Sequence, residues 1–170
     1  MATGRLSTLL NVVLTVPVAP GILAHEYAHV AGCRLAGVSV ESLRPLTVLT
    51  DEAGVVHERV DSFPADVVVG FAPLVVNSAL AAGCFVAAAL FTAWVPGQLV
   101  LTWAGGAFGI TAFPTHYDTE SFLRTARAPG GRPGLLALAV AYPLRALTAV
   151  PYLAGVYGLL WTVYLYAHLG

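Results

Sequence analysis

Charged residues are scarce in this chain, and lysine is missing altogether. Only 10% of the 170 residues are charged and 58% are hydrophobic, whereas soluble domains carry about 25% charged residues. The basic residues are all arginine, which is typical of a GC-rich genome. A net charge of −1 gives no sign of a nucleic-acid partner. The composition predicts one integral-membrane domain over residues 1–170, embedded in a lipid bilayer.

Cysteine is also rare, which argues against a disulfide-stabilised scaffold. Cys33 and Cys84 lie in separate apolar stretches and suit small buried hydrophobic positions. The first apolar stretch is too long for a cleavable signal peptide and has no convincing cleavage site. We therefore expect it to stay in the chain as a helix.

Long apolar stretches are what the sequence has in place of charge. A membrane-spanning helix needs about 20 mainly apolar residues. Pro17 and Pro20 interrupt the first stretch and predict a kink or break there. Pro143, Arg145 and Pro151 divide the last stretch, so a short interfacial helix is expected at 134–144, or else two crossings joined by a tight turn. The predicted crossings are residues 6–35, 67–93, 98–113 and 147–168.

The most polar stretch, residues 37–66, separates the first two apolar ones. Hydrophobic and polar residues alternate on both sides of a turn that contains Gly54, which predicts a β-hairpin. The expected fold class is thus an all-α polytopic membrane protein. It has about four transmembrane helices and a small β-hairpin between the first and the second. The metal-binding core would cover about 15–125, with C-terminal helices at about 134–168.

Arginine near the predicted helix ends indicates the orientation. The loops after the first and third crossings each carry three arginines, whereas the opposite side has Arg5 alone among its short segments. The positive-inside rule makes the arginine-rich side cytoplasmic. We therefore expect a multi-pass protein of a prokaryotic cell membrane. Residues 25–29 and 114–120 would lie at similar depth, near its cytoplasmic side.

Residues 25–29 spell HExxH inside an apolar stretch. His25 and His29 lie on one face of a helix, a turn apart, so both imidazoles can bind one zinc ion while Glu26 acts as general acid and base. Random placement of the five His and five Glu gives this pattern about 0.004 times in the chain. Ionisable residues in a membrane helix are costly and usually functional.

A catalytic zinc usually takes a third protein ligand. Asp118 is the first choice, since it follows the third crossing at the depth expected for the motif. His116 is the alternative metal ligand. Asp118 could instead cap a short surface helix that starts at Thr119. The full set of candidates is His57, His116, Asp118, Glu120 and His168.

The segment from Pro20 to Val38, with PGILAHEYAH at its start, resembles the first core helix of site-2 proteases, which are intramembrane zinc metalloproteases. In that family a helix with HExxH leads into a small β-region. A second core helix follows, and then a third that brings an Asp ligand. This order matches residues 15–125. Residues 113–118 are similar to the family's Pro-containing segment before that Asp.

Residues 71–77, FAPLVVN, are similar to the family's Gly-Pro-and-Asn signature. By this resemblance Asn77 would face the active site and help hold substrate, although a bond between helices is the alternative role. Ala72 and Thr119 stand where the family commonly has Gly. No PDZ-like domain fits, which indicates a small, divergent member.

The motif and the resemblance together predict an intramembrane zinc metalloprotease with one Zn²⁺ per chain. Its substrate would be a membrane protein or peptide. The rivals are a membrane zinc protein without peptidase activity, for structure or sensing, and a metal-ion transport component. A transporter should carry polar residues along a continuous path, whereas here they cluster at one depth.

Overall fold

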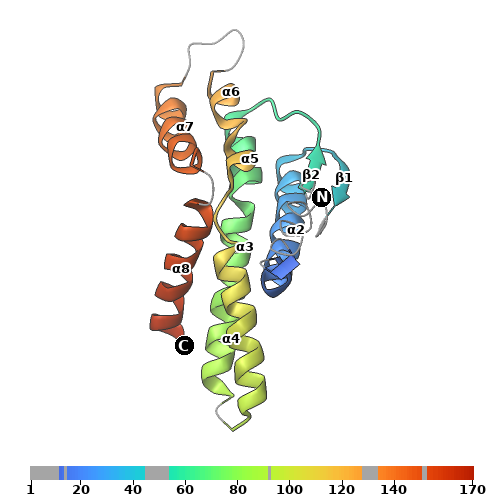
Figure 1. Ribbon diagram of the computed structural model, residues 1–170. Coiled ribbons are helices and arrows are strands. Elements are labelled where there is room, and N and C mark those ends of the chain that lie inside the picture. Colours follow the sequence, from blue (N-terminus) through green and yellow to red (C-terminus); the bar gives the residue numbers. More distant parts are fainter. Residues whose placement is uncertain (1–11, 14, 45–53, 92, 128–133, 151–152) are drawn as a thin grey trace, which may run out of the picture.

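The computed structural model describes residues 12–13, 15–44, 54–91, 93–127, 134–150 and 153–170. It is mostly helical with one two-stranded antiparallel sheet, as the sequence predicts. Helices α3 (Phe63–Leu90) and α4 (Val95–Ile110) form a long hairpin, visible in green and yellow in Figure 1. Helix α2 (Ala19–Ala36) and the strands lie on one side of it, and α7 (Leu135–Thr148) and α8 (Leu153–Leu169) lie on the other.

Helix α2 starts at a proline and ends at a glycine. The 3₁₀ helix η1 (Val16–Val18) contains Pro17, and Pro20 occupies the first turn of α2, where its missing N–H breaks no helical bond. The predicted break before the HExxH is therefore confirmed. Gly37 ends the helix at φ 70°, a left-handed conformation that glycine adopts at no steric cost.

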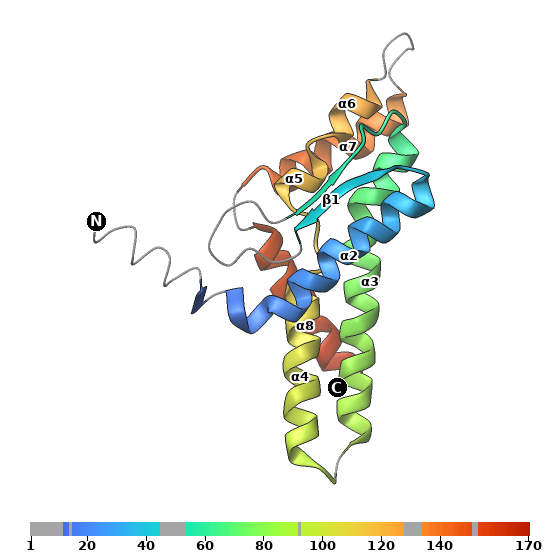
Figure 2. The same cartoon turned by 90° about the vertical axis from the view of Figure 1, so that its right-hand side faces the viewer.

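Helix α2 runs obliquely across the α3–α4 hairpin (Figure 2). Two glycines allow the close approach. A Cβ at Gly21 would collide with the carbonyl oxygen of Ala107 on α4, and one at Gly32 would lie 2.9 Å from the Cβ of Ala72 on α3. Both ends of α2 are thus held against the hairpin.

The predicted β-hairpin is confirmed. Strand β1 (Val40–Arg44) pairs antiparallel with β2 (Gly54–His57), with Arg44 opposite Gly54 and Val40 opposite His57. The register is irregular between Val40 and Ser42. Residues 50–53 of the predicted turn lie outside the described residues, and its last residue, Gly54, is the first residue of β2.

Two short helices follow α4, namely α5 (His116–Thr119) and α6 (Phe122–Ala126). The Phe122 ring is fully buried and stacks on Phe71 of α3 at 6.0 Å between ring centroids. Phe122 and Ala126 also pack against Ala141 of α7. This cluster fixes α6 between α3 and α7.

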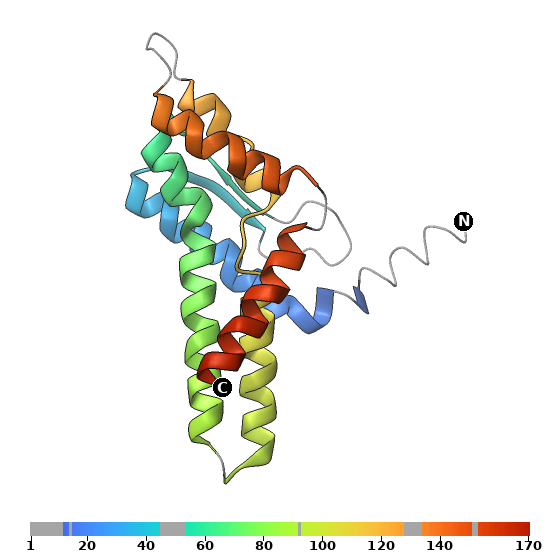
Figure 3. The same cartoon turned by 90° about the vertical axis from the view of Figure 1, so that its left-hand side faces the viewer.

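The C-terminal region folds as two helices, with different bounds from those predicted. Helix α7 continues through Pro143 to Thr148, and α8 begins at Leu153. Ala141, two residues before Pro143, and Leu144, directly after it, pack in the cluster around Phe122. This packing supports α7 where the proline removes a backbone hydrogen bond. Helix α8 lies along α3 and α4 (Figure 3), and the indole of its Trp161 donates to Ser78 Oγ at 2.8 Å.

By length and composition, one helix of the described chain is able to cross a membrane, namely α3. The pair α7 and α8, bent by 95°, adds a second if it forms one span. Of the four crossings that the sequence predicts, therefore, not all form helices long and apolar enough to span a membrane. Helix α2 contains the polar side chains of the HExxH, and α4 has 16 residues. Arg5 and Arg132, used to predict the orientation, lie outside the described residues.

Candidate metal centre

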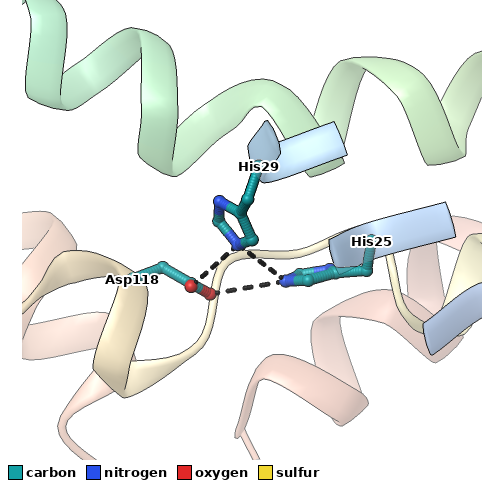
Figure 4. Close-up of side chains that lie close together, drawn as sticks. All are labelled: His25, His29 and Asp118. Atoms are coloured by element: carbon teal, nitrogen blue, oxygen red, sulfur yellow. Dashed lines mark hydrogen bonds and ion pairs between the residues drawn. The ribbon is translucent and has the colours of Figure 1, made fainter. Parts of the chain in front are cut away.

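Two histidines of α2 and one aspartate of α5 converge on one point (Figure 4). The Nε2 atoms of His25 and His29 are 3.1 Å apart. His29 Nε2 lies 2.9 Å from Asp118 Oδ1, and His25 Nε2 lies 3.6 Å from Asp118 Oδ2. The structure therefore brings together the three residues that the sequence predicted as ligands, and this group could hold a metal ion.

Backbone carbonyl groups orient both imidazoles. His25 Nδ1 donates to the carbonyl oxygen of Thr111 at 2.7 Å, and His29 Nδ1 donates to that of Val69 at 2.9 Å. A carbonyl oxygen only accepts, so the proton of each neutral imidazole sits on Nδ1 and its Nε2 lone pair is free. Ligand histidines in metal proteins are commonly oriented by such bonds.

The two free Nε2 atoms and the Asp118 carboxylate are all hydrogen-bond acceptors. Their convergence is repulsive unless a cation or extra protons lie between them. Protonating both imidazoles would set two positive charges side by side. Tetrahedral ligands about 2.1 Å from a zinc ion lie about 3.4 Å from one another, close to the observed 3.1 and 3.6 Å. The residues present thus fit a metal ion.

Asp118 faces the two histidines and also caps a helix, although not the helix starting at Thr119 that the sequence left open. It is the third residue of α5, and its Oδ2 accepts from the backbone N–H of Thr115 at 2.5 Å and from the Thr115 hydroxyl at 2.7 Å. It therefore caps α5, which begins before Thr119 and not at it. Burial alone would raise the pKa of Asp118, but the facing imidazoles of His25 and His29, when protonated on Nε2, donate hydrogen bonds to its carboxylate and hold that pKa well below its usual range.

A second carboxylate, Asp66, holds the segment that carries Asp118. Asp66 lies in the first turn of α3 and is 2% exposed. Its two oxygens accept from Ser121 Oγ at 2.5 Å and from Thr125 Oγ1 at 2.7 Å. No sequence pattern points to this role, because an acidic residue soon after Ser62 and Pro64 is typical of an ordinary helix start.

Glu26 shares a cavity of about 840 Å³ with the ligand group. Its side chain is half-buried, one residue after His25 on α2. The volume lies within the usual range of ligand pockets. All of β2 lines the cavity, from Gly54 to His57, whereas β1 contributes Arg44 among the described residues.

The other candidate ligands are not part of the converging group. Both ring nitrogens of His116 face the guanidinium of Arg145 on α7, so they point away from the ligand group. His57 lines the cavity, and its Nδ1 is 2.7 Å from the carbonyl oxygen of Glu58. Glu120 and His168 are exposed.

Asn77 is fully buried where α2, α3 and α4 meet. Its Nδ2 lies 3.0 Å from the carbonyl oxygen of Gly21 and 3.0 Å from the hydroxyl of Thr111. It is not among the described residues that line the cavity. This environment agrees with the bond between helices that the sequence left as an alternative, while a part in substrate binding stays a prediction.

No protein-family model, curated protein or solved structure matches this chain. The resemblance to site-2 proteases therefore stays a prediction from the motifs of the sequence.

Proposed function

We propose that the chain is an intramembrane zinc metallopeptidase that cleaves membrane-embedded or membrane-adjacent peptides. The observation that carries this proposal is the convergence of His25, His29 and Asp118 beside Glu26 at the wall of one cavity. Two imidazoles and one carboxylate are a ligand set that suits zinc, and three protein ligands leave a position open.

In this proposal different groups of the chain orient the metal ligands and transfer the proton. When bound, Zn²⁺ polarises a peptide carbonyl and lowers the pKa of water. Glu26 accepts a proton from the attacking water and passes it to the leaving amine. The carbonyl oxygens of Thr111 and Val69 keep the two imidazoles turned toward the ligand position. Each of these roles uses a group that borders the cavity or lies directly behind it.

A membrane location is supported by the apolar surface of the α3–α4 hairpin. Near the turn of this hairpin, Leu90 is 77% exposed, Trp94 61% and Leu99 66%. Exposed apolar surface of this extent marks contact with lipid or protein. We propose that this end lies in the hydrocarbon. The proposal includes the multi-pass topology, with the site toward the cytoplasm.

Substrate access involves the β-hairpin in this proposal. A transmembrane peptide hides its carbonyl groups in its own helical bonds, so cleavage requires a locally extended segment. The β2 strand borders the cavity and, within the part of the chain that the structure describes, belongs to a sheet with two strands. One edge of β2 therefore has no partner among the described strands, and we call it the free edge. An extended peptide that pairs with this edge would run past the ligand group.

Replacing Glu26 tests the peptidase. Zinc content and zinc-dependent cleavage of a fluorogenic transmembrane peptide are measured in detergent for the wild type, Glu26→Gln and Glu58→Gln. Glu58 is the matched control, since it is an exposed glutamate of the hairpin region. Glu26→Gln should retain zinc and lose cleavage by about 10² to 10⁴-fold. A zinc-bound wild type that cleaves no faster than Glu26→Gln would instead support a structural or sensing site.

The ligand set has its own test in the same preparation. Bound zinc per chain should fall in His25→Ala, His29→Ala and Asp118→Ala, and stay at the wild-type level in His116→Ala. Full zinc in Asp118→Ala together with a loss in His116→Ala would show that the third ligand is wrong.

A further inference from the structure

The third ligand lies on a helix that has little stability of its own. Helix α5 has four residues, from His116 to Thr119. Forming one helical turn is unfavourable in isolation, so contacts with other elements decide where α5 lies. His25 and His29, by contrast, lie within the 18-residue helix α2. The position of Asp118 therefore depends on what holds α5.

Helix α5 presents two different faces. Residues three apart on a helix lie on the same side. Thr115 and Asp118 form one such pair, and this pair faces the ligand group. His116 and Thr119 form the other pair, and this pair faces α7.

The face toward α7 makes two polar contacts. The hydroxyls of Thr119 and Thr148 lie 2.6 Å apart, with 0% and 8% of the two residues exposed. The guanidinium of Arg145 lies against both ring nitrogens of His116. Arg145 and Thr148 are themselves three residues apart on α7, so they lie on one side of that helix. The two contacts therefore join one side of α5 to one side of α7.

We infer that Arg145 and Thr148 of α7 are positioning residues for the metal ligand Asp118. Thr119 adjoins Asp118 in sequence, so a shift of α5 away from α7 also moves the carboxylate. A zinc–oxygen bond of about 2.0–2.2 Å leaves little room for such a shift. Metal affinity therefore depends on α7, a helix that contributes no ligand. This inference rests on the metal site of the proposed function and does not require peptidase activity.

Zinc affinity, measured by chelator competition in detergent, tests the inference. Thr148→Val removes the hydroxyl that contacts Thr119, with little change of volume. Arg145→Gln removes the guanidinium that contacts His116. Each should weaken zinc binding about 10-fold, as for other residues that support metal ligands. Thr148→Ser keeps a hydroxyl and should bind zinc with the affinity of the wild type.

Tyr142→Phe is the matched control. The Tyr142 hydroxyl accepts from Arg127 at 2.7 Å, and this bond joins α7 to the end of α6 and not to α5. Its loss should leave zinc affinity unchanged, whereas a merely structural role of α7 would make this variant behave like Thr148→Val.

A double-mutant cycle shows whether the effect runs through Asp118. In an Asp118→Ala background, Thr148→Val and Arg145→Gln should no longer change zinc affinity. The inference is overturned if Thr148→Val and Arg145→Gln both keep wild-type zinc affinity, or if they lose as much affinity in the Asp118→Ala background as in the wild type. A wild type that binds zinc without cleaving peptide overturns only the proposed peptidase activity, because the test of α7 measures zinc binding and not cleavage.

Discussion

His25 and Asn77 donate hydrogen bonds to the same acceptor, the carbonyl oxygen of Thr111. The distance is 2.7 Å from His25 Nδ1 and 3.3 Å from Asn77 Nδ2. Thr111 ends α4, whereas the donors belong to α2 and α3. One carbonyl group thus links the candidate metal ligand His25 to Asn77, the buried amide between the packed helices.

Asn77→Ala should weaken both the fold and the metal site. The substitution removes the side-chain amide that donates to Gly21 and Thr111, so the buried carbonyl oxygen of Gly21 and the partly buried oxygens of Thr111 lose this donor. We expect a loss of about 2 kcal/mol in the free energy of unfolding and a loss of zinc affinity of about 10-fold. Denaturant titration and chelator competition measure the two effects.

Ser78→Ala is the control for this experiment. Ser78 is the next residue of α3, and its hydroxyl accepts from Trp161 of α8, on the side away from the ligands. It should lose stability without losing zinc affinity. If Asn77→Ala keeps wild-type stability and zinc affinity but raises KM for the peptide, then Asn77 binds substrate, as the resemblance implies.

Asp66→Asn should destabilise the segment that carries Asp118. An amide nitrogen in place of one carboxylate oxygen cannot accept from Ser121 or Thr125. We expect unfolding to become easier by about 2 kcal/mol and zinc affinity to fall. Asp61→Asn is the control, because Asp61 is exposed and its ion pair with Arg59, at 3.8 Å, is a surface pair worth little. Equal stability of the two variants would contradict the role given to Asp66.

Proline in β2 should separate peptide binding from zinc binding. Adjacent residues of an antiparallel strand turn their N–H groups to opposite edges. Of Val55→Pro and Val56→Pro, one therefore breaks a bond to β1, and the other removes a donor from the free edge alone. The second variant should keep its zinc and its melting temperature while cleavage falls at least about 10-fold.

Threonine at the same two positions provides the control, since it keeps the backbone N–H and a β-branched side chain. Val55→Thr and Val56→Thr should cleave the peptide at nearly the wild-type rate. Wild-type cleavage by both proline variants would rule out pairing of the substrate with this edge.

Local patterns predicted much of what local geometry controls. The spacing of His25 and His29 places both imidazoles on one side of a helix whatever else surrounds them, because the helical period sets it. Pro20 and Gly37 mark the start and end of that helix through their own backbone limits. Alternation around Gly54 predicted the hairpin for the same reason, since strand geometry alternates side chains.

Long-range choices were beyond such patterns. Asp118 and His116 lie two residues apart in one short helix, and both are metal-binding residue types. The sequence could rank them but could not orient them. Packing of α5 against α3 and α7 turns Asp118 toward His29 and His116 toward Arg145. Asp66 went unnoticed because its partners, Ser121 and Thr125, are distant in sequence.

The sequence by itself determined a helix with two imidazoles on one face and an adjacent carboxylate, since hydrogen bonding within one helix is enough to place them. The tertiary structure alone decided which distant carboxylate completes the group, and which carbonyl oxygens orient the imidazoles. Those contacts join residues of different helices, and their geometry follows from how the helices pack.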